Sequence, residues 1–201
     1  TYYHLDILVN PSDSSIRGSN TIHYMILQPA NVMQIDLQEP MKITGVEQNG
    51  RQLTFERDGN AWFIRLPLQA VPGSSGKIRV HYEGKPKVSH RPPWDGGIAW
   101  RHDENGKPFD ASANQGDGAS LWWPCKDHMY DEPDSMLISV TTPGDLMNVS
   151  NGRLRSNEEN ADGTKTWHWF VSNPISNYVV NINIGDYVHF GELYNGEKGP
   201  L

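Results

Sequence analysis

The sequence has few of the cysteines that cross-link small domains and lacks the long apolar runs of membrane-spanning helices. Its 201 residues include a single cysteine, Cys125, so no disulfide can form within the chain. No apolar run reaches the roughly 18 residues that a membrane-spanning helix needs. A chain of this length can bury a core that needs neither a disulfide nor a metal. We therefore expect stability from side-chain packing and no membrane span in this segment, while one cysteine leaves the cellular compartment undetermined.

Positive charge is also in short supply. The chain has 17 lysine and arginine residues against 24 aspartate and glutamate residues, a formal net charge of −7. This balance argues against binding nucleic acid or an anionic membrane through a general electrostatic footprint. The expected partners are peptides, sugars or another protein domain.

Complete catalytic motifs are missing. The sequence lacks His-Glu-x-x-His, which would place two imidazole ligands and a general base on one face of a helix. It also lacks the Gly-x-Ser-x-Gly turn of serine hydrolases, the phosphate-binding Gly-x-x-x-x-Gly-Lys and a paired Cys-x-x-Cys. We therefore predict that this chain alone is inactive and holds neither a metal nor a cofactor.

Short segments of alternating apolar and polar residues dominate the chain. Residues 33–38 are the clearest case, because every second residue from Met33 is apolar. Six further segments each place three apolar side chains on one face: Ile22/Tyr24/Ile26, Trp62/Ile64/Leu66, Ile78/Val80/Tyr82, Met136/Ile138/Val140, Trp167/Trp169/Val171 and Val180/Ile182/Ile184. Turn dipeptides separate them: Asn49-Gly50, Asp58-Gly59, Asn105-Gly106, Asn151-Gly152 and Asp162-Gly163. With 19 glycines, 14 prolines and no convincing helical period, the chain is predicted to be all-β and antiparallel, with few or no long helices.

One stretch, residues 85–133, breaks the regular spacing. Residues 91–97 read Arg-Pro-Pro-Trp-Asp-Gly-Gly, and residues 121–125 read Leu-Trp-Trp-Pro-Cys. Aromatic, glycine and charged residues gather here on what must be mostly loop, and functional groups tend to lie on loops held by a rigid scaffold. This stretch is therefore the candidate functional region.

Several chemistries are conceivable in that stretch. A loop-built metal site or acid–base pair could draw on these residues: His90, His102, Asp103, Asp127, His128, Asp131 and Glu132. Their spacings match no standard ligand set, which favours solvated loop charges and turn-capping carboxylates. Cys125 could be a nucleophile, but a lone cysteine without a specified partner is more often a small buried apolar residue.

Four tryptophans lie in or beside the same stretch: Trp94, Trp100, Trp122 and Trp123. Exposed tryptophans can stack sugars or anchor a partner, although most tryptophans pack in cores. Because adjacent strand residues point to opposite faces, we expect Trp122 and Trp123 to be divided between this domain's core and a neighbouring domain.

Residues 115–128, Gln-Gly-Asp-Gly-Ala-Ser-Leu-Trp-Trp-Pro-Cys-Lys-Asp-His, resemble the gluzincin zinc aminopeptidases, the family of aminopeptidase N and leukotriene hydrolase. Residues 3–21 are similar to the first β-hairpin of that family, and residues 178–187 to the strand that closes its N-terminal domain. The resemblance implies a saddle-shaped, sandwich-like antiparallel β domain over residues 1–192. It also implies that residues 193–201 begin a linker to a catalytic domain.

The resemblance assigns roles to single residues. In the family, a glutamine shortly before the Pro-Cys-x-Asp element projects into the active site, and that glutamine corresponds to Gln115, with Gly116 and Asp117 as possible neighbours in the site. An amide suits this role because it donates and accepts hydrogen bonds without adding charge. Support of the core or of a domain interface is implied for these residues: Trp122, Trp123, Pro124, Cys125 and Asp127. The chain departs from the family at residues 116–120, Gly-Asp-Gly-Ala-Ser, where many members carry a glutamate and an Ala-Arg pair.

The implied function is that of a non-catalytic N-terminal domain of a zinc metallo-aminopeptidase. Its partners would be its own C-terminal catalytic domain, which carries the zinc, and the N-terminus of a peptide substrate. Two alternatives remain open at this point. One is a stand-alone β-sandwich module that binds carbohydrate or protein through its tryptophans. The other is an inactive relative that has lost its zinc ligands and serves protein interaction.

Overall fold

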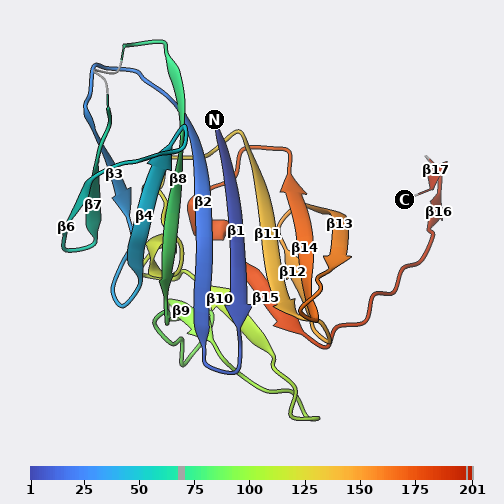
Figure 1. Ribbon diagram of the computed structural model, residues 1–201. Coiled ribbons are helices and arrows are strands. Elements are labelled where there is room, and N and C mark those ends of the chain that lie inside the picture. Colours follow the sequence, from blue (N-terminus) through green and yellow to red (C-terminus); the bar gives the residue numbers. More distant parts are fainter. Residues whose placement is uncertain (68–70, 198, 201) are drawn as a thin grey trace.

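The computed structural model describes residues 1–67, 71–197 and 199–200. Within these residues the regular structure is almost entirely β, and the helical elements are two single turns of 3-10 helix, η1 (Ala119–Leu121) and η2 (Asn177–Val179). The prediction of an all-β fold without long helices is therefore confirmed for this part of the chain (Figure 1).

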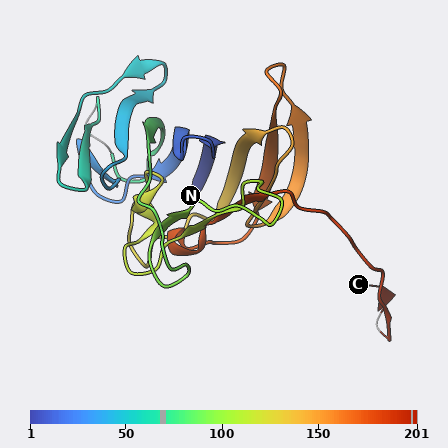
Figure 2. The ribbon, with the colours of Figure 1, turned by 90° about the horizontal axis from the view of Figure 1, so that it is seen from below.

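An eight-stranded sheet forms the largest layer. Its strands run in the order β13 (Arg153–Glu159), β14 (Thr164–Val171), β11 (Ser135–Pro143), β1 (Tyr2–Asn10), β2 (Ser15–Met25), β8 (Ser75–Gly84), β4 (Lys42–Gln48) and β5 (Arg51–Gln52). The turn between β4 and β5 has Asn49 and Gly50 at φ 51° and 76°, as expected of an Asn-Gly hairpin. The sheet curves into a trough, so that the domain has the saddle shape expected of it (Figure 2).

One strand pair departs from the antiparallel pattern. Strand β1 pairs with β11 in parallel, with Tyr2 opposite Ser135 and Leu8 opposite Thr141. A side-chain period of two is common to parallel and antiparallel strands, so alternation alone could not distinguish them. The sheet is therefore mixed. Parallel strands need a long connection, and the chain between β1 and β11 makes up most of the domain.

Two smaller sheets flank the large one. A four-stranded sheet has the order β12 (Met147–Ser150), β15 (Ile182–Gly185), β10 (Asp110–Ala113) and β9 (Gly97–Ala99). A three-stranded sheet has the order β3 (Val32–Asp36), β7 (Ala61–Arg65) and β6 (Phe55–Asp58). The four-stranded sheet lies against the convex face of the trough, whereas the three-stranded sheet lies beside its β4 edge (Figures 1 and 2).

The core fills the space between the trough and the four-stranded sheet. Six of the seven alternating segments contribute buried apolar side chains to it, as their patterns predict, and the seventh packs half-buried Trp169 and Val171 against it. Fully buried side chains from both layers meet there: Leu5, Ile7, Ile78, Val80, Ile98, Ile138, Ile182 and Ile184. Burial of this continuous apolar surface supplies the main stabilising free energy of the fold.

The chain leaves the body of the domain after β15. Asp186 and Tyr187 still contact Lys107 and Phe109, and residues 188–194 then run outward without strand pairing to a short hairpin of β16 (Asn195–Gly196) and β17 (Gly199–Pro200) (Figure 1). Val188, Phe190 and Leu193 are exposed along this tail. The linker predicted at 193–201 includes residues 198 and 201, which lie outside the described residues.

Candidate functional site

Three loops leave the same end of the four-stranded sheet. Strand β10 pairs antiparallel with β9, with Ala113 opposite Gly97, and with β15, with Ala111 opposite Asn183. Residues that follow β10 therefore emerge beside residues that precede β9 and β15. The hydroxyl of exposed Tyr178 reaches Gln115, and the loop that carries exposed Trp94 leaves the same end of the sheet.

Asn114 anchors the loop that carries Gln115. Its side chain is 6% exposed, and its Nδ2 donates to the carbonyl oxygens of Tyr178 at 2.7 Å and Val180 at 3.1 Å. Its Oδ1 accepts a hydrogen bond from Trp122 Nε1 at 2.9 Å. The amide is thus fully used inside the fold, and the residue after it is held at the surface.

The rest of the loop is braced from several directions. Lys87 Nζ lies 2.6 Å from Asp117 Oδ2, and Gln38 Nε2 donates to the Asp117 carbonyl oxygen at 2.6 Å. Gly116 and Gly118 have φ of 81° and 89°, a conformation that other residues rarely adopt. At Gly118 a Cβ would also lie 2.3 Å from the carboxylate of Asp127. These two glycines therefore shape the loop.

Gln115 is exposed at the tip of the braced loop, where its Oε1 accepts a hydrogen bond from the hydroxyl of Tyr178. The structure thus places Gln115 where its amide can meet a ligand. Gly116 and Asp117 are exposed beside it, although Asp117 is held by Lys87. The role of these residues in binding remains a prediction.

Trp122 and Trp123 are not divided between two domains. Both are 0% exposed, and their ring centroids lie 5.9 Å apart at 53° in one core. The expectation of opposite faces assumed a strand, whereas these residues follow the 3-10 turn η1, in which successive side chains do not alternate. Neither ring can stack a sugar, whereas Trp94 is 78% exposed and accessible.

The residues around Cys125 brace the fold. Cys125 is 0% exposed, and burial, followed by the charge of Asp127, raises the pKa of its thiol well above its usual value. A neutral buried thiol is a poor nucleophile. The carbonyl of Pro124 accepts from the buried Asn20 Nδ2 at 2.9 Å, while Asp127 Oδ2 accepts from the Ser120 backbone at 3.0 Å.

The loop histidines do not assemble a metal site. His90, His102 and His128 are exposed, and no cluster of three or more His, Cys, Asp or Glu side chains suited to a metal occurs among the described residues. Asp131 instead pairs with Lys126 at 3.1 Å. Turn capping describes these groups better than ligation does.

The loop that carries Trp94 is organised by a single carboxylate. Asp95 accepts hydrogen bonds from the Ser89 hydroxyl at 2.6 Å and from the backbone of His90 and Arg91 at 2.8 and 2.9 Å. The Ser89 hydrogen bond, with smaller contributions from the two backbone donors, lowers the pKa of Asp95 to about 2. Trp94 is thus an exposed ring on an ordered loop.

A polar chain of side chains crosses the open face of the large sheet. Ser139 Oγ lies 2.9 Å from His4 Nε2 and 2.8 Å from His168 Nδ1, and His168 Nε2 lies 3.4 Å from Glu158. The group resembles a hydrolase triad in composition, but Ser139 is only 1% exposed. A hydroxyl closed off from substrate serves as a bridge between β1, β11 and β14.

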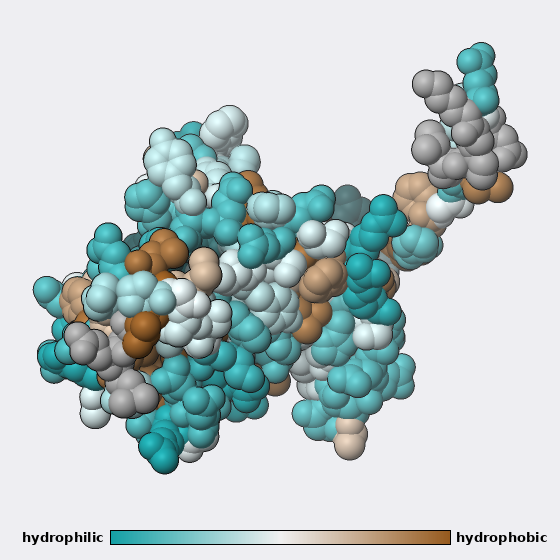
Figure 3. Space-filling model, turned by 90° about the horizontal axis from the view of Figure 1, so that it is seen from above, coloured by the Kyte–Doolittle hydropathy of each residue, from teal (hydrophilic) through white to brown (hydrophobic). Residues whose placement is uncertain are grey.

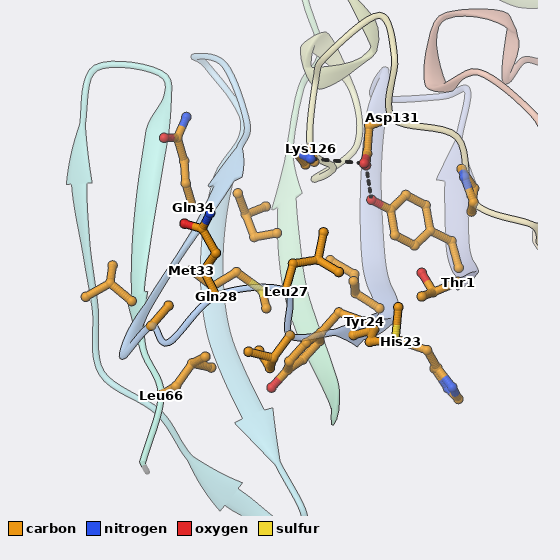
Figure 4. A pocket seen from close by; sticks show the side chains of 18 of the residues that line it. Thr1, His23, Tyr24, Leu27, Gln28, Met33, Gln34, Leu66, Lys126 and Asp131 are labelled. Atoms are coloured by element: carbon orange, nitrogen blue, oxygen red, sulfur yellow. Dashed lines mark hydrogen bonds and ion pairs between the residues drawn. The ribbon is translucent and has the colours of Figure 1, made fainter. Parts of the chain in front are cut away.

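A pocket of about 400 Å³ lies where β2 ends, beside β3 and the loop 126–133 (Figure 4). Met25, Leu27 and Met33 contribute apolar surface to it, and Asp131 lies at its rim with Tyr3 donating to its Oδ2 at 3.4 Å. From this end the molecule shows an apolar patch within a mostly hydrophilic surface (Figure 3). The pocket offers apolar contact but no set of catalytic groups.

One buried carboxylate stands apart from these sites. Asp110 begins β10 and is 4% exposed; its Oδ1 accepts from the Arg101 backbone at 3.1 Å, while its Oδ2 has no partner among the described residues. Burial raises the pKa of Asp110 to about 6, against the opposing effects of the Arg101 hydrogen bond and nearby His102. Ionisation of Asp110 therefore costs the folded state free energy.

Asp110→Asn should stabilise the protein at alkaline but not at acidic pH. Since the folded pKa of about 6 exceeds the unfolded value, the favourable contribution of protonated Asp110 is complete below about pH 4 and is lost as the pH rises through 6. The variant should raise the free energy of unfolding by about 1–3 kcal/mol at pH 8 and change it little at pH 4. Urea unfolding of both proteins at the two pH values measures this. A difference that does not change with pH would contradict it.

Comparison with known proteins shows which family and which solved structures this chain is similar to. The Peptidase M1 N-terminal domain family matches residues 1–179. An M1 zinc metallopeptidase from Deinococcus radiodurans is similar in structure, with a TM-score of 0.76 and 22% identity over 92% of this chain and 41% of its own. No curated protein sequence matches the chain.

Two further structures give the same picture. One is a two-domain M1 zinc metallopeptidase variant bound to L-tryptophan, with a TM-score of 0.76, 22% identity and 92% and 42% of the two chains covered. The other is a Deinococcus radiodurans M1 variant bound to a Tyr-Ser-Ala substrate, with a TM-score of 0.75, 22% identity and 92% and 41% covered. This chain therefore spans about two fifths of the length of the structures it matches.

Sequence reasoning did not single out Asn114, Lys87 or Tyr178. Tyr178 lies 63 residues from Gln115. The resemblance places it in the strand that closes the domain, but this is wrong at the start of that strand, because Tyr178 lies in the 3-10 turn η2 and β15 begins only at Ile182. The two come together because β15 runs antiparallel to β10, the strand that leads to Gln115, and this pairing is visible only in the structure.

Proposed function

Because the chain belongs to the peptidase M1 family as its N-terminal domain, we propose that it is the non-catalytic domain of a zinc aminopeptidase. In this proposal residues 1–192 form the domain, and residues 193–201 begin the connection to a catalytic domain. The domain supports that catalytic domain, and exposed Gln115 lines the pocket for the substrate N-terminus.

The observation that carries the proposal is the construction of the Gln115 loop. Asn114 and Asp117 hold it on both sides of an amide that faces outward. An outward amide can accept a hydrogen bond from a substrate α-ammonium through Oε1 and donate to a carbonyl through Nε2. Ordered polar groups of this kind fix the orientation of a ligand.

The described residues do not fit a zinc site, because they contain no group of three metal-binding side chains. In the proposal the zinc and the groups that act on the scissile bond belong to the catalytic domain. An inactive relative would lack these groups. The sequence of the catalytic domain therefore discriminates between an active aminopeptidase and an inactive relative.

The test uses the full-length protein and a matched pair of substrates, an aminoacyl p-nitroanilide and its N-acetyl derivative. The free-amine substrate should be cleaved, and the rate should fall when zinc is removed and recover when zinc is restored. The acetylated substrate should be cleaved about tenfold more slowly or worse, because it cannot make the charge-assisted hydrogen bond of an α-ammonium. Equal cleavage of both substrates, or no zinc-dependent cleavage, would contradict an aminopeptidase.

A further inference from the structure

Tyr178 has a fixed backbone and an exposed ring. It lies in η2, where its carbonyl oxygen accepts from Asn114 and the carbonyl oxygen of Val179 accepts from Asn151 Nδ2 at 3.0 Å. Asn177, the residue before it, donates from Nδ2 to the carbonyl oxygen of Lys126 at 2.7 Å. The turn is thus tied to three other segments, whereas the Tyr178 side chain itself is 45% exposed. Packing in the core does not account for this ring.

The hydroxyl of Tyr178 reaches one atom that matters for the proposed site, Oε1 of Gln115. An exposed glutamine left alone samples many rotamers and both orientations of its amide, which exchange the donor and the acceptor. A hydroxyl that donates to Oε1 selects one orientation. It leaves a second lone pair on Oε1 and both Nε2 hydrogens available to a ligand.

Both ends of this hydrogen bond are held by the same residue. Asn114 precedes Gln115 in the chain and binds the carbonyl oxygen of Tyr178, so the spacing between the two side chains is set by the fold and not by chance contact of flexible loops. Trp122 Nε1 completes the arrangement by donating to Asn114 Oδ1 at 2.9 Å. The pair is thus connected directly to the core.

We propose that Tyr178 is a positioning residue, which orients the Gln115 amide so that the α-ammonium of a peptide substrate meets a preorganised acceptor. The inference rests on the proposed function of Gln115 and adds a residue whose effect passes entirely through that amide. Ordering a polar group before binding reduces the entropy that binding must otherwise remove.

A double-mutant cycle in the full-length zinc enzyme tests this. Tyr178→Phe removes the hydroxyl and keeps the ring, and it should raise KM for aminoacyl substrates about three- to tenfold with kcat nearly unchanged, as expected for loss of one hydrogen bond that favours bound substrate and transition state alike. In a Gln115→Ala background the same change should have no further effect. Tyr130→Phe is the matched control. Tyr130 is also exposed, at 84%, and its ring contacts His128.

Each outcome decides something. If Gln115→Ala lowers activity and Tyr178→Phe does not, the positioning role is overturned while the proposed function stands. If Tyr178→Phe is equally harmful with and without Gln115, the tyrosine acts independently of the amide, which also overturns it. If Tyr178→Phe loses activity together with a lower Tm, and Tyr130→Phe shows neither change, Tyr178 has only a structural role. If Gln115→Ala itself retains full activity, the proposed substrate-binding role of Gln115 fails, and the positioning role fails with it.

Discussion

Gln115→Ala in the full-length enzyme should lower kcat/KM on aminoacyl substrates roughly tenfold or more, equivalent to about 1.4 kcal/mol or more of lost substrate or transition-state contact. The side chain is exposed, and its backbone is held by the bonds of Asn114 and Asp117, which the substitution leaves in place. Folding and zinc content should therefore be unaffected. Steady-state kinetics on substrates that differ in their first residue, with Tm and metal content measured alongside, give the answer.

The control for this change is Gln52→Ala. Gln52 is also exposed, but it lies in β5 at the edge of the large sheet. It should keep full kcat/KM. Full activity of Gln115→Ala across all substrates would remove this loop from the active-site wall.

Trp123→Ala should lower the free energy of unfolding by about 3–5 kcal/mol, the range for deleting a large buried aromatic side chain. The ring is 0% exposed, lies beside Trp122, and packs edge-on against Tyr3 with centroids 5.9 Å apart at 80°. Its Nε1 has no hydrogen-bond acceptor among the described residues, so packing alone accounts for its contribution. Urea unfolding monitored by circular dichroism measures the change.

Trp94→Ala is the matched control, because it removes the same side chain from a position that is 78% exposed. Its effect on the free energy of unfolding should stay within about 0.5 kcal/mol, as for most surface substitutions. Trp123→Phe should fall between the two, since a smaller ring leaves a smaller cavity. A loss below about 1 kcal/mol for Trp123→Ala would show that the core does not depend on this ring.

The two predictions separate roles that the sequence places side by side. Gln115 and Trp123 lie eight residues apart in one motif, yet one faces outward and the other is at the centre of the core. Asn114 and Trp122 link them through a hydrogen bond of 2.9 Å. Damage to the core is therefore expected to disturb the loop, whereas damage at Gln115 should leave the core intact.

Much of the fold follows from local patterns in the chain. Alternation in segments such as 33–38 and 136–140 predicts which side chains are buried, because a strand turns every second residue toward the same face. Asn-Gly at 49–50 predicts a hairpin turn, since both residues adopt positive φ there. The resemblance at residues 115–128 identifies the family and the glutamine, both from short-range sequence.

Other features depend on where distant segments meet, and no local pattern contains that information. The sequence by itself determined the all-β class, the buried faces and the family, and it singles out Gln115 as a candidate whose role stays a prediction. Only the tertiary structure decided that β1 runs parallel to β11, that Trp122 and Trp123 share one core, and that Tyr178 reaches Gln115. Strand direction leaves a period of two unchanged, a 3-10 turn breaks the alternation that a strand would impose, and a contact across 63 residues is set by the path of the chain between them.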